Sequence, residues 1–299
     1  MPLIEYTLEG KVDKVEKAIE RIRHYDPLKE NAVLKNSEPY YVCYSGGKDS
    51  DVLRILFEMS GVKYDLVHNH TTVDAPETVY YIRSIPNIQI SMPDITMWDL
   101  IVKKRMPPTR LVRYCCSELK ERGGMGRVIA TGVRWAESVK RQSRGYAESY
   151  TSKKESSVKI YTDNDDEESR DLLNACMTAQ KWVVNPIIDW QEDDVWEFLN
   201  HHNCKSNPLY ECGYKRIGCL MCPMAQGKGQ LRDAERYPKY KQAYIKAFDR
   251  MIEQNEIDGV GYYSEKSRTR YQTGEECFDW WTSTGKQREI DENQMELAM

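Results

Sequence analysis

The stretch Ser45-Gly46-Gly47-Lys48-Asp49-Ser50 has the residue types of an anion-binding turn. Its two glycines let the backbone come close to a bound group and adopt positive φ angles. Two serines add hydroxyl donors and the lysine adds a point charge. The stretch departs from the Walker pattern, because only Ser-Gly-Gly precedes the lysine. We interpret it as a site for a phosphate or sulfate; an ordinary strand-to-helix turn is the alternative.

Four cysteines form a second group of residues that could bind a metal or do chemistry. Cys115 and Cys116 are adjacent, and Cys219 and Cys222 form a Cys-x-x-Cys pair. Neighbouring residues of a helix project about 100° apart, which is awkward for two ligands of one tetrahedral zinc. A 4Fe–4S cluster presents its irons at separate corners, so adjacent cysteines can each bind one. The pattern favours a 4Fe–4S cluster, with zinc and incidental thiols as the alternatives.

The elements around these residues follow an alternating order. Short β-rich runs are separated by segments with helical spacing of apolar residues, which predicts a parallel twisted sheet with helices on both faces. Ligands of such sheets bind beyond the carboxyl ends of the strands, where the SGGKDS stretch falls. We expect strands at residues 39–44, 64–68, 88–90, 127–133 and 183–188, and helices within 11–24, 52–59, 76–82, 97–102, 193–200 and 233–255.

The predicted organisation has three parts. Residues 1–35 form an N-terminal helical segment, 36–232 a nucleotide-binding domain with the cysteine site, and 233–299 a helical extension ending in a polar tail. An acidic loop at 162–169 is interpreted as a solvated surface.

The composition limits the classes of function that the chain can have. The net charge of −4 indicates no global basic field for nucleic acid, although a local basic patch at 103–113 or 140–144 stays open. No apolar stretch approaches the length of a membrane span, and no secretory signal is visible, so we expect a cytoplasmic chain without membrane contact. Nine cysteines in such a chain favour metal binding or catalysis over disulfides.

Five motifs, in order, resemble those of the phosphoadenylyl-sulfate (PAPS) reductase family within the adenine-nucleotide α-hydrolase superfamily. The SGGKDS stretch resembles the family's SGGxDS pyrophosphate loop. Residues 132–138 resemble GVR-x-x-ES, 185–196 resemble PI-x-DW-x-x-x-DVW, and 207–219 resemble NPLY-x-x-GY-x-x-IGC. The adjacent cysteines followed far downstream by Cys-x-x-Cys are similar to the cluster signature of adenylyl-sulfate reductases.

The resemblance implies an adenine-nucleotide site. Asp74 and Glu77 are candidate magnesium ligands if the substrate is ATP, although Glu77 equally suits the first turn of a helix. His68 and His70 are as readily structural as functional. The residues implied to bind nucleotide are Ser45, Gly46, Gly47, Lys48, Asp49, Ser50, Gly132, Arg134, Glu137 and Arg141, with Lys48 also a candidate catalytic group.

One departure from the family pattern bears on the reaction. The family's reductases carry a nucleophilic cysteine within Glu-Cys-Gly-x-x-His on a C-terminal tail, whereas this chain has Glu276-Cys277-Phe278 without the glycine and histidine. A nucleophilic thiolate needs exposure and a lowered pKa. Cys277 is therefore a candidate nucleophile, and a thiol packed beside the following aromatic residues is the alternative.

Three functions remain, and we place the first ahead. The chain is a reductase that converts adenylyl sulfate or PAPS to sulfite through Cys277 and a thioredoxin-like reductant. Alternatively it is an ATP pyrophosphatase and sulfurtransferase, in which the cluster carries or relays sulfur to a nucleic acid or other acceptor and Cys277 is not needed. The third is a non-catalytic nucleotide-binding iron–sulfur subunit.

Overall fold

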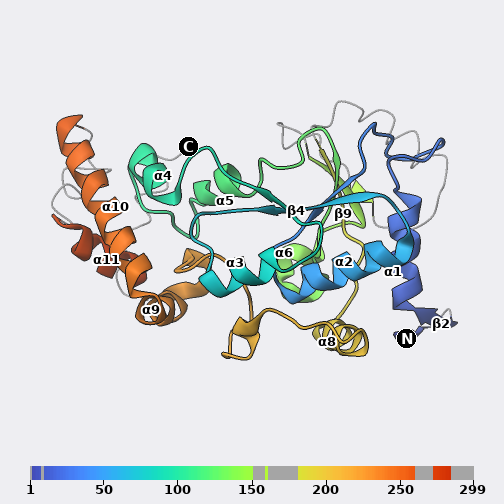
Figure 1. Ribbon diagram of the computed structural model, residues 1–299. Helices are drawn as coiled ribbons and strands as arrows, with labels where there is room; N and C mark the ends of the chain where they lie inside the picture. Colours follow the sequence, from blue (N-terminus) through green and yellow to red (C-terminus); the bar gives the residue numbers. More distant parts are fainter. Residues whose placement is uncertain (1, 8–9, 151–158, 161–180, 260–271, 284–299) are drawn as a thin grey trace. The chain divides into compact units, whose positions relative to one another are not determined.

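The computed structural model describes residues 2–7, 10–150, 159–160, 181–259 and 272–283 (Figure 1). The chain separates into two compact units, each assembled from several segments. Unit 1 contains Met1–Asn69, Pro76–Ser91 and Gly123–Ile217; unit 2 contains His70–Ala75, Met92–Arg122 and Gly218–Met299. The units are interleaved along the chain, whereas the predicted boundaries divide it linearly.

Unit 1 is built on a seven-stranded sheet of order β5-β4-β3-β6-β9-β7-β8. Its first five strands in this order are parallel. At one edge β7 pairs antiparallel with β9, and β8 pairs antiparallel with β7. The predicted α/β class and mostly parallel sheet are confirmed; the antiparallel pairing at this edge was not predicted. The strands are β3 (Tyr40–Cys43), β4 (Tyr64–Asn69), β5 (Gln89–Ser91), β6 (Val128–Ala130), β7 (Ala147–Tyr150), β8 (Lys159–Ile160) and β9 (Lys181–Val184).

The main hydrophobic core of unit 1 joins the sheet to three helices. Buried side chains of α1 (Lys14–His24), α2 (Lys48–Ser60) and α8 (Glu192–His201) pack with those of β3, β6 and β9. Side chains that alternate with these on the strands form a small second cluster. This period of two is the pattern of a sheet buried on both faces. The unit also contains α3 (Pro76–Arg83), η1 (Trp135–Glu137), α6 (Val139–Gln142) and η3 (Pro208–Tyr210).

The N-terminal segment differs from the predicted helical one. Before α1 the chain forms an antiparallel hairpin of β1 (Ile4–Thr7) and β2 (Gly10–Asp13). Asp13 then caps α1, its side chain accepting the backbone N–H of Val15 at 3.0 Å. The predicted helix therefore begins later than its apolar spacing suggested, because Val12 belongs to the hairpin.

Unit 2 is helical in its described part. It contains α4 (Met97–Lys104), α5 (Tyr114–Leu119), η4 (Pro223–Ala225), α9 (Gln226–Arg236), α10 (Pro238–Ile257) and α11 (Gly274–Thr282). The single helical segment predicted for 233–255 is two helices, because Pro238 has no N–H and opens α10. Rings of α4 and α10 meet at Trp98 and Tyr244, whose centroids are 4.8 Å apart.

No helix in the described ranges is long and apolar enough to cross a bilayer. The predicted acidic loop and the polar tail lie outside the described residues.

Helix α11 packs directly onto α10 through a glycine. A Cβ added to Gly274 would lie 2.2 Å from the backbone oxygen of Ile245 and 2.8 Å from Cγ of Asp249. Gly274 also donates its N–H to Asp249 Oδ1 at 2.5 Å. A side chain here would push the two helices apart, so the glycine is required for this contact.

We expect Gly274→Ala to lower the free energy of unfolding by about 2 kcal/mol, since overpacking against helix backbone typically costs ~1–3 kcal/mol. Denaturant unfolding followed by tryptophan fluorescence measures this. Glu275→Ala, at the next and exposed position, is the matched control and should change stability by less than about 0.5 kcal/mol. Equal stability of the two variants would show that α11 does not pack on α10 in this way.

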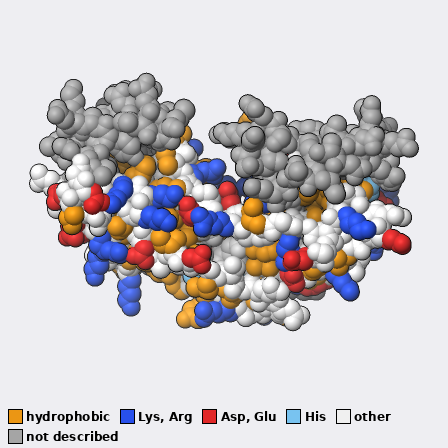
Figure 2. Space-filling model, turned by 90° about the horizontal axis from the view of Figure 1, so that it is seen from above, with side chains coloured by type: hydrophobic (Ala, Val, Ile, Leu, Met, Phe, Trp, Pro, Cys, Tyr) orange, Lys and Arg blue, Asp and Glu red, His pale blue; other side chains and the backbone are white. Residues whose placement is uncertain are grey.

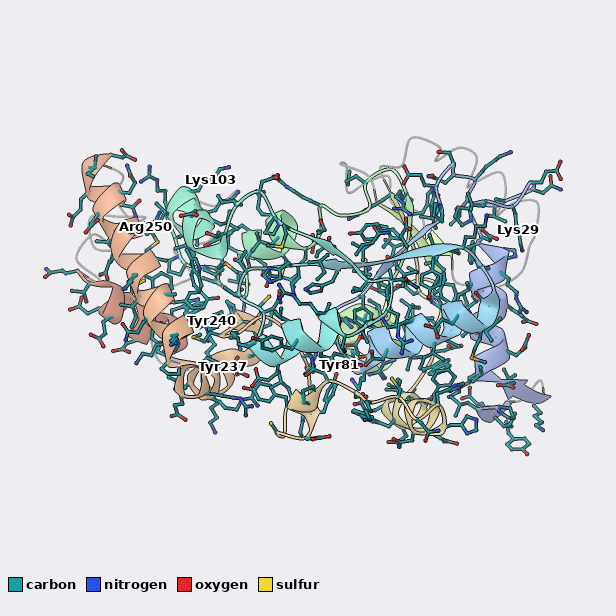
Figure 3. All side chains as sticks on the ribbon, in the orientation of Figure 1. Lys29, Tyr81, Lys103, Tyr237, Tyr240 and Arg250 are labelled. Atoms are coloured by element: carbon teal, nitrogen blue, oxygen red, sulfur yellow. The ribbon has the colours of Figure 1, made fainter. Side chains whose placement is uncertain are left out.

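Asp51 is a buried carboxyl group in α2. It is fully excluded from solvent and accepts hydrogen bonds at Oδ1 from the hydroxyls of Tyr44 and Tyr81, while Oδ2 accepts none from the described residues. Tyr81, on α3, is labelled in Figure 3. Burial raises the pKa of Asp51 to about 6, and the two tyrosine hydrogen bonds oppose this only in part.

The folded chain therefore holds a proton on Asp51 that the unfolded chain releases near pH 4. Asp51 should make stability fall as pH rises from about 4 to about 6, by about 3 kcal/mol in total for this difference in pKa. Relative to the parent, Asp51→Asn should gain that amount between pH 4 and pH 7 in urea unfolding. The exposed Asp94→Asn should show no such gain; a pH-independent difference for Asp51→Asn would exclude a raised pKa.

Candidate functional site

The SGGKDS loop connects the carboxyl end of β3 to the first turn of α2 in unit 1. Gly46 has a φ of +72°, and a Cβ there would lie 3.0 Å from Cγ1 of Ile82, so both conformation and space require glycine. Ser50 Oγ accepts the N–H of Gly47 at 3.1 Å and donates to its carbonyl at 2.7 Å. The loop thus presents the N-terminus of a 13-residue helix, where backbone N–H groups and the dipole favour an anion.

Two residues of the NPLY segment hold this loop in place. Tyr210 Oη accepts the backbone N–H of Lys48 at 2.9 Å, and its ring packs edge-on against Trp196 with centroids 5.1 Å apart. Asn207, which is 1% exposed, donates from Nδ2 to the Gly46 carbonyl at 3.1 Å. These side chains fix the loop backbone.

The charged groups of the loop form a closed network. Lys48 Nζ lies 3.1 Å from Asp49 Oδ2 and 3.4 Å from Glu192 Oε1. Arg134, only 2% exposed, donates from Nε to Asp49 Oδ1 at 2.6 Å and from Nη2 to Glu192 Oε2 at 2.7 Å. Two cations are thus matched by two carboxylates. Arg134, expected to face the nucleotide, instead has its donors directed at the chain's own carboxylates.

Gly132 brings β6 and the loop into contact. A Cβ on Gly132 would lie 2.9 Å from the backbone oxygen of Asp49, a contact that real Cβ atoms do not make with backbone. The glycine of the GVR segment therefore lets the first turn of α2 approach the end of β6, and it contributes space to the site and no functional group.

Glu137 and Arg141 lie next to this network. Arg134 donates its backbone N–H to Glu137 Oε2 at 3.2 Å, and Arg141 forms an ion pair with the same carboxylate. Burial, together with the neighbouring charges of Arg216 and Arg144, lowers the pKa of Arg141 to about 10. The structure thus brings the predicted residues of the SGGKDS and GVR segments together in unit 1.

Sequence reasoning missed Glu192, Asn207, Tyr210 and Arg216 as members of this site. The first three lie within segments that carry the family resemblance, so a signal was present. Their residue types alone do not indicate that they contact the SGGKDS loop, because that contact depends on the fold. Arg216 lies at a variable position of its segment and gave no signal.

The four predicted ligand cysteines lie together in unit 2. Cys115 and Cys116 are in α5, and the Cys219–Cys222 turn precedes η4; all four are half-buried. Several side chains and one backbone bridge fix the turn. Asp233 accepts the Met221 N–H at 3.0 Å, Tyr244 donates to the Leu220 carbonyl at 3.2 Å, and Leu220 N–H donates to the Val73 carbonyl at 2.8 Å.

The electrostatics of this cluster favour a thiolate at Cys116, whereas burial raises the pKa of Cys222. A hydrogen bond from the Cys115 thiol lowers the pKa of Cys116 to about 6, with help from Lys120 and Arg113, and the same hydrogen bond raises the pKa of Cys115. The pKa of Lys120 is raised, chiefly by Cys219. A cation beside four sulfurs offsets part of the negative charge of a thiolate-bound cluster.

No three His, Cys, Asp or Glu side chains of the described residues are arranged to hold a single metal ion. A cubane binds each thiolate at a separate iron, so its four ligands stand farther apart than those of one zinc ion. Which group the four cysteines hold, an iron–sulfur cluster or zinc, stays a prediction.

The predicted magnesium and histidine residues have internal roles. Asp74, in unit 2, accepts the Thr71 N–H at 2.8 Å, and its backbone forms an isolated antiparallel β-bridge with Cys219. Glu77 belongs to unit 1. His68 Nδ1 is hydrogen-bonded to the Tyr44 carbonyl at 2.9 Å, and His70 Nδ1 accepts the Thr72 N–H at 3.0 Å. The histidines are thus engaged in structure, and magnesium binding stays a prediction.

Cys277, the candidate nucleophile, lies in α11 and is 0% exposed. Phe278 and Trp281 of the same helix are also buried, and Trp281 packs on Tyr244 and Phe248 of α10 with centroids 4.9 and 5.4 Å away. Attack on a sulfate requires an accessible thiolate. This setting is that of the packed thiol, and it does not suit the nucleophile.

Two cations of the predicted basic stretch at 103–113 pair with carboxylates within unit 2. Lys104 lies 3.0 Å from Glu118, and Arg105 pairs with Asp258. Figure 2 shows Lys and Arg side chains interspersed with acidic and hydrophobic ones on the face it presents.

Comparison with curated proteins finds distant relatives. An uncharacterised protein of Methanocaldococcus jannaschii is 23% identical over 252 residues, covering 81% of this chain and 54% of its own length. The adenosine 5′-phosphosulfate reductase of Oceanobacillus iheyensis is 25% identical over 194 residues, covering 61% of this chain and 70% of its own. The chain thus spans about half the length of the first relative.

Solved structures with related folds include the PAPS reductase of Candida auris, with a TM-score of 0.40 and 16% identity over 73% of this chain and 98% of that one. Another is the U34-tRNA thiolase NcsA of Methanococcus maripaludis with its [4Fe-4S] cluster, with a TM-score of 0.40 and 13% identity over 92% of each chain.

The sequence model of the phosphoadenosine phosphosulfate reductase domain matches residues 39–225, the stretch that contains the loop, the GVR and NPLY segments and all four clustered cysteines. The chain therefore belongs to the phosphoadenosine phosphosulfate reductase family.

Proposed function

We propose that this chain is an ATP-dependent, AMP-forming enzyme of sulfur transfer: it binds an adenine nucleotide at the SGGKDS loop and activates an acceptor for thiolation. The observation that carries this choice over the reductase is the position of Cys277, which is 0% exposed in a helix packed through Gly274 onto α10. Thiol attack on an adenylyl sulfate needs an accessible nucleophile, whereas adenylyl transfer from ATP needs none from the protein.

The loop geometry supplies the electrostatics for such a transfer. The N-terminus of α2, positioned by Tyr210, Asn207 and Ser50, lies at the loop, and the positive end of its helix dipole favours the phosphate charge. Because this dipole is fixed before the nucleotide arrives, it costs no reorganisation during the reaction. Magnesium, when bound, would neutralise phosphate charge.

The proposed chemistry takes place at the α-phosphorus. An acceptor oxygen forms a bond to the α-phosphorus and its proton passes to solvent, while the bond to the bridging β-phosphate oxygen breaks and pyrophosphate leaves with the electron pair. A hydrosulfide donor then attacks the acceptor carbon: a carbon–sulfur bond forms, the carbon–oxygen bond breaks, and AMP leaves with the electron pair. The role of the loop is to bind and orient the phosphates for the first displacement.

Cys115, Cys116, Cys219 and Cys222 would hold a 4Fe–4S cluster, and Lys120 would balance part of its negative charge. Such a cluster, when bound, supplies a site for sulfur or electron chemistry. What the chain's own residues do is hold the ligand turn rigid, through Asp233, Tyr244 and the Leu220 backbone bridge to Val73.

A reductase is the second candidate, favoured by the curated relatives named adenosine 5′-phosphosulfate reductase. In that case Cys277 would have to leave its buried position to attack the sulfate sulfur and form a thiosulfonate that a thioredoxin-like protein resolves.

We expect anaerobically purified protein to form AMP and pyrophosphate from ATP, with a higher rate in the presence of total tRNA as a probe acceptor. It should release no sulfite from adenylyl sulfate or PAPS with thioredoxin. Lys48→Gln should lower pyrophosphate release about 100-fold, the scale of losing one preorganised electrostatic contact. Chromatography of nucleotides and a sulfite assay measure the two reactions in parallel.

Cys277→Ser separates the two candidates. It should leave pyrophosphate release unchanged within about twofold, because a serine fits the volume of the buried thiol. Thermal unfolding of each variant shows whether it is folded. Sulfite release that disappears in Cys277→Ser, without pyrophosphate from ATP, would establish the reductase and overturn the proposal.

A further inference from the structure

The charges of α10 in unit 2 are arranged against the dipole of that helix. Its first turn contains Lys239 and Lys241 and no acidic residue, and its end carries Glu253, Glu256 and Asp258 with no basic residue in the last turn. A helix is stabilised by the opposite arrangement, with acidic side chains at its start and basic ones at its end. Such a departure from local electrostatics is expected where a function requires the charges.

The preceding helix, α9, presents a row of cations to solvent. Lys228, Arg232 and Arg236 recur every four residues, so they share one face of the helix, and all three are exposed. Like charges at this spacing repel one another and destabilise a helix. The first turn of α9 has no acidic residue either. The outer face of α9 and the start of α10 therefore form one basic surface of unit 2.

Most of this charge is not neutralised by the described part of the chain. Among the described residues, Lys228, Lys239 and Lys246 have no carboxylate partner, and all three are exposed. Arg232 lies 3.4 Å from Oδ1 of Asp233, a carboxylate that also accepts a backbone N–H through its other oxygen. An anion from outside the chain would thus meet cations that are still available to it.

A turn just before the adjacent cysteines adds a cation from a third element of unit 2. Thr109 donates its backbone N–H to the Val112 carbonyl at 3.1 Å, and its Oγ1 accepts the Val112 N–H at 3.0 Å. Trp281 of α11 holds the turn by donating from Nε1 to the Pro108 carbonyl at 2.6 Å. The turn exposes Arg110, which has no ion pair within the described ranges.

The distribution of these charges indicates what kind of partner they fit. They lie on two helices and a turn and point to solvent, whereas a small ligand is bound by a few groups that converge in a pocket. Lysine is depleted at protein–protein interfaces but common in contacts with the phosphates of nucleic acids. Because no single helix carries all of them, they suit the phosphates of a folded RNA better than insertion of one helix into the groove of a DNA duplex.

We propose that the outer faces of α9 and α10, together with Arg110, bind the phosphate backbone of a folded RNA, and that RNA is the acceptor of the sulfur transfer. The inference rests on the proposed function, which requires an acceptor and does not identify it. The net charge of −4 of the whole chain is compatible with it, since the basic surface is local. RNA bound there is held by the unit that contains the four clustered cysteines.

Fluorescence anisotropy with a labelled tRNA transcript, measured over a range of salt concentrations, tests this on the full chain without turnover. The surface variant combines three substitutions, Lys228→Ala, Lys239→Ala and Lys246→Ala. The control variant removes the same charge from exposed positions of unit 1, by Lys11→Ala, Lys35→Ala and Lys63→Ala. Thermal unfolding shows whether both variants are folded.

We expect the logarithm of the tRNA affinity to fall linearly with the logarithm of the salt concentration. The slope should decrease in magnitude by about 2 in the surface variant, because each lost phosphate contact removes roughly 0.7–0.9. At about 100 mM salt this variant should bind at least about tenfold more weakly than the parent, and the control variant should bind within about twofold of it. Arg110→Ala should reduce the slope by about 1, and Arg110→Lys should restore it.

Equal affinity and equal slope of the surface and control variants would overturn the surface. Binding of a DNA duplex with the same number of phosphates, or of poly-glutamate, as tightly as the tRNA would overturn the assignment to RNA. Failure of the proposed function gives a different result. Surface-dependent tRNA binding without pyrophosphate release from ATP would refute the reaction and keep the surface, and pyrophosphate release with equal tRNA binding by the two variants would do the reverse.

Discussion

The carboxylate of Asp49 is the contact on which the nucleotide site depends. One carboxylate oxygen pairs with Lys48 at 3.1 Å and the other with Arg134 at 2.6 Å. The backbone oxygen of Asp49 lies close to Gly132. Together with Glu192 this network leaves the loop without net side-chain charge. Attraction for an anion must then come from the positive end of the α2 helix dipole and from charges farther out.

The second unit depends on a different kind of contact. Gly274 lets α11 pack on the backbone of α10. Tyr244 of α10 donates a hydrogen bond to the carbonyl of Leu220 in the cysteine turn. Figure 3 shows Tyr237 and Tyr240 together near the start of this helix, and Tyr240 donates to the Asp74 carbonyl at 3.2 Å. The same helix thus supports the cysteine turn and buries the face that contains Cys277. A thiol placed there is part of the scaffold behind the cysteine turn.

Much of this arrangement was predictable because it is local. The strand–glycine turn–helix around Gly46 and the four cysteines were read from residue types and spacing. The hairpin before α1 was missed because Val12 continues the apolar spacing of the helix, so periodicity alone did not show where the strand ended. The antiparallel edge strands β7 and β8 gave no signal either, since pairing direction depends on the return path of the chain. Glu192 and Tyr210 act on the loop from far along the sequence, which only the fold reveals.

The family's segments also differ in what they indicate about the reaction. In the PI-x-DW segment, Asp189 makes two hydrogen bonds with Arg21 of α1, both at 2.8 Å, and Arg21 lies 4.0 Å above the ring of Tyr146. The NPLY segment fixes the loop backbone, and Gly132 provides space. These residues preserve a binding site whichever bond is broken there. Membership in the family therefore follows from parts that hold the SGGKDS loop, and the choice between the proposed sulfur transfer and a reductase depends on a group outside them, the buried thiol of Cys277.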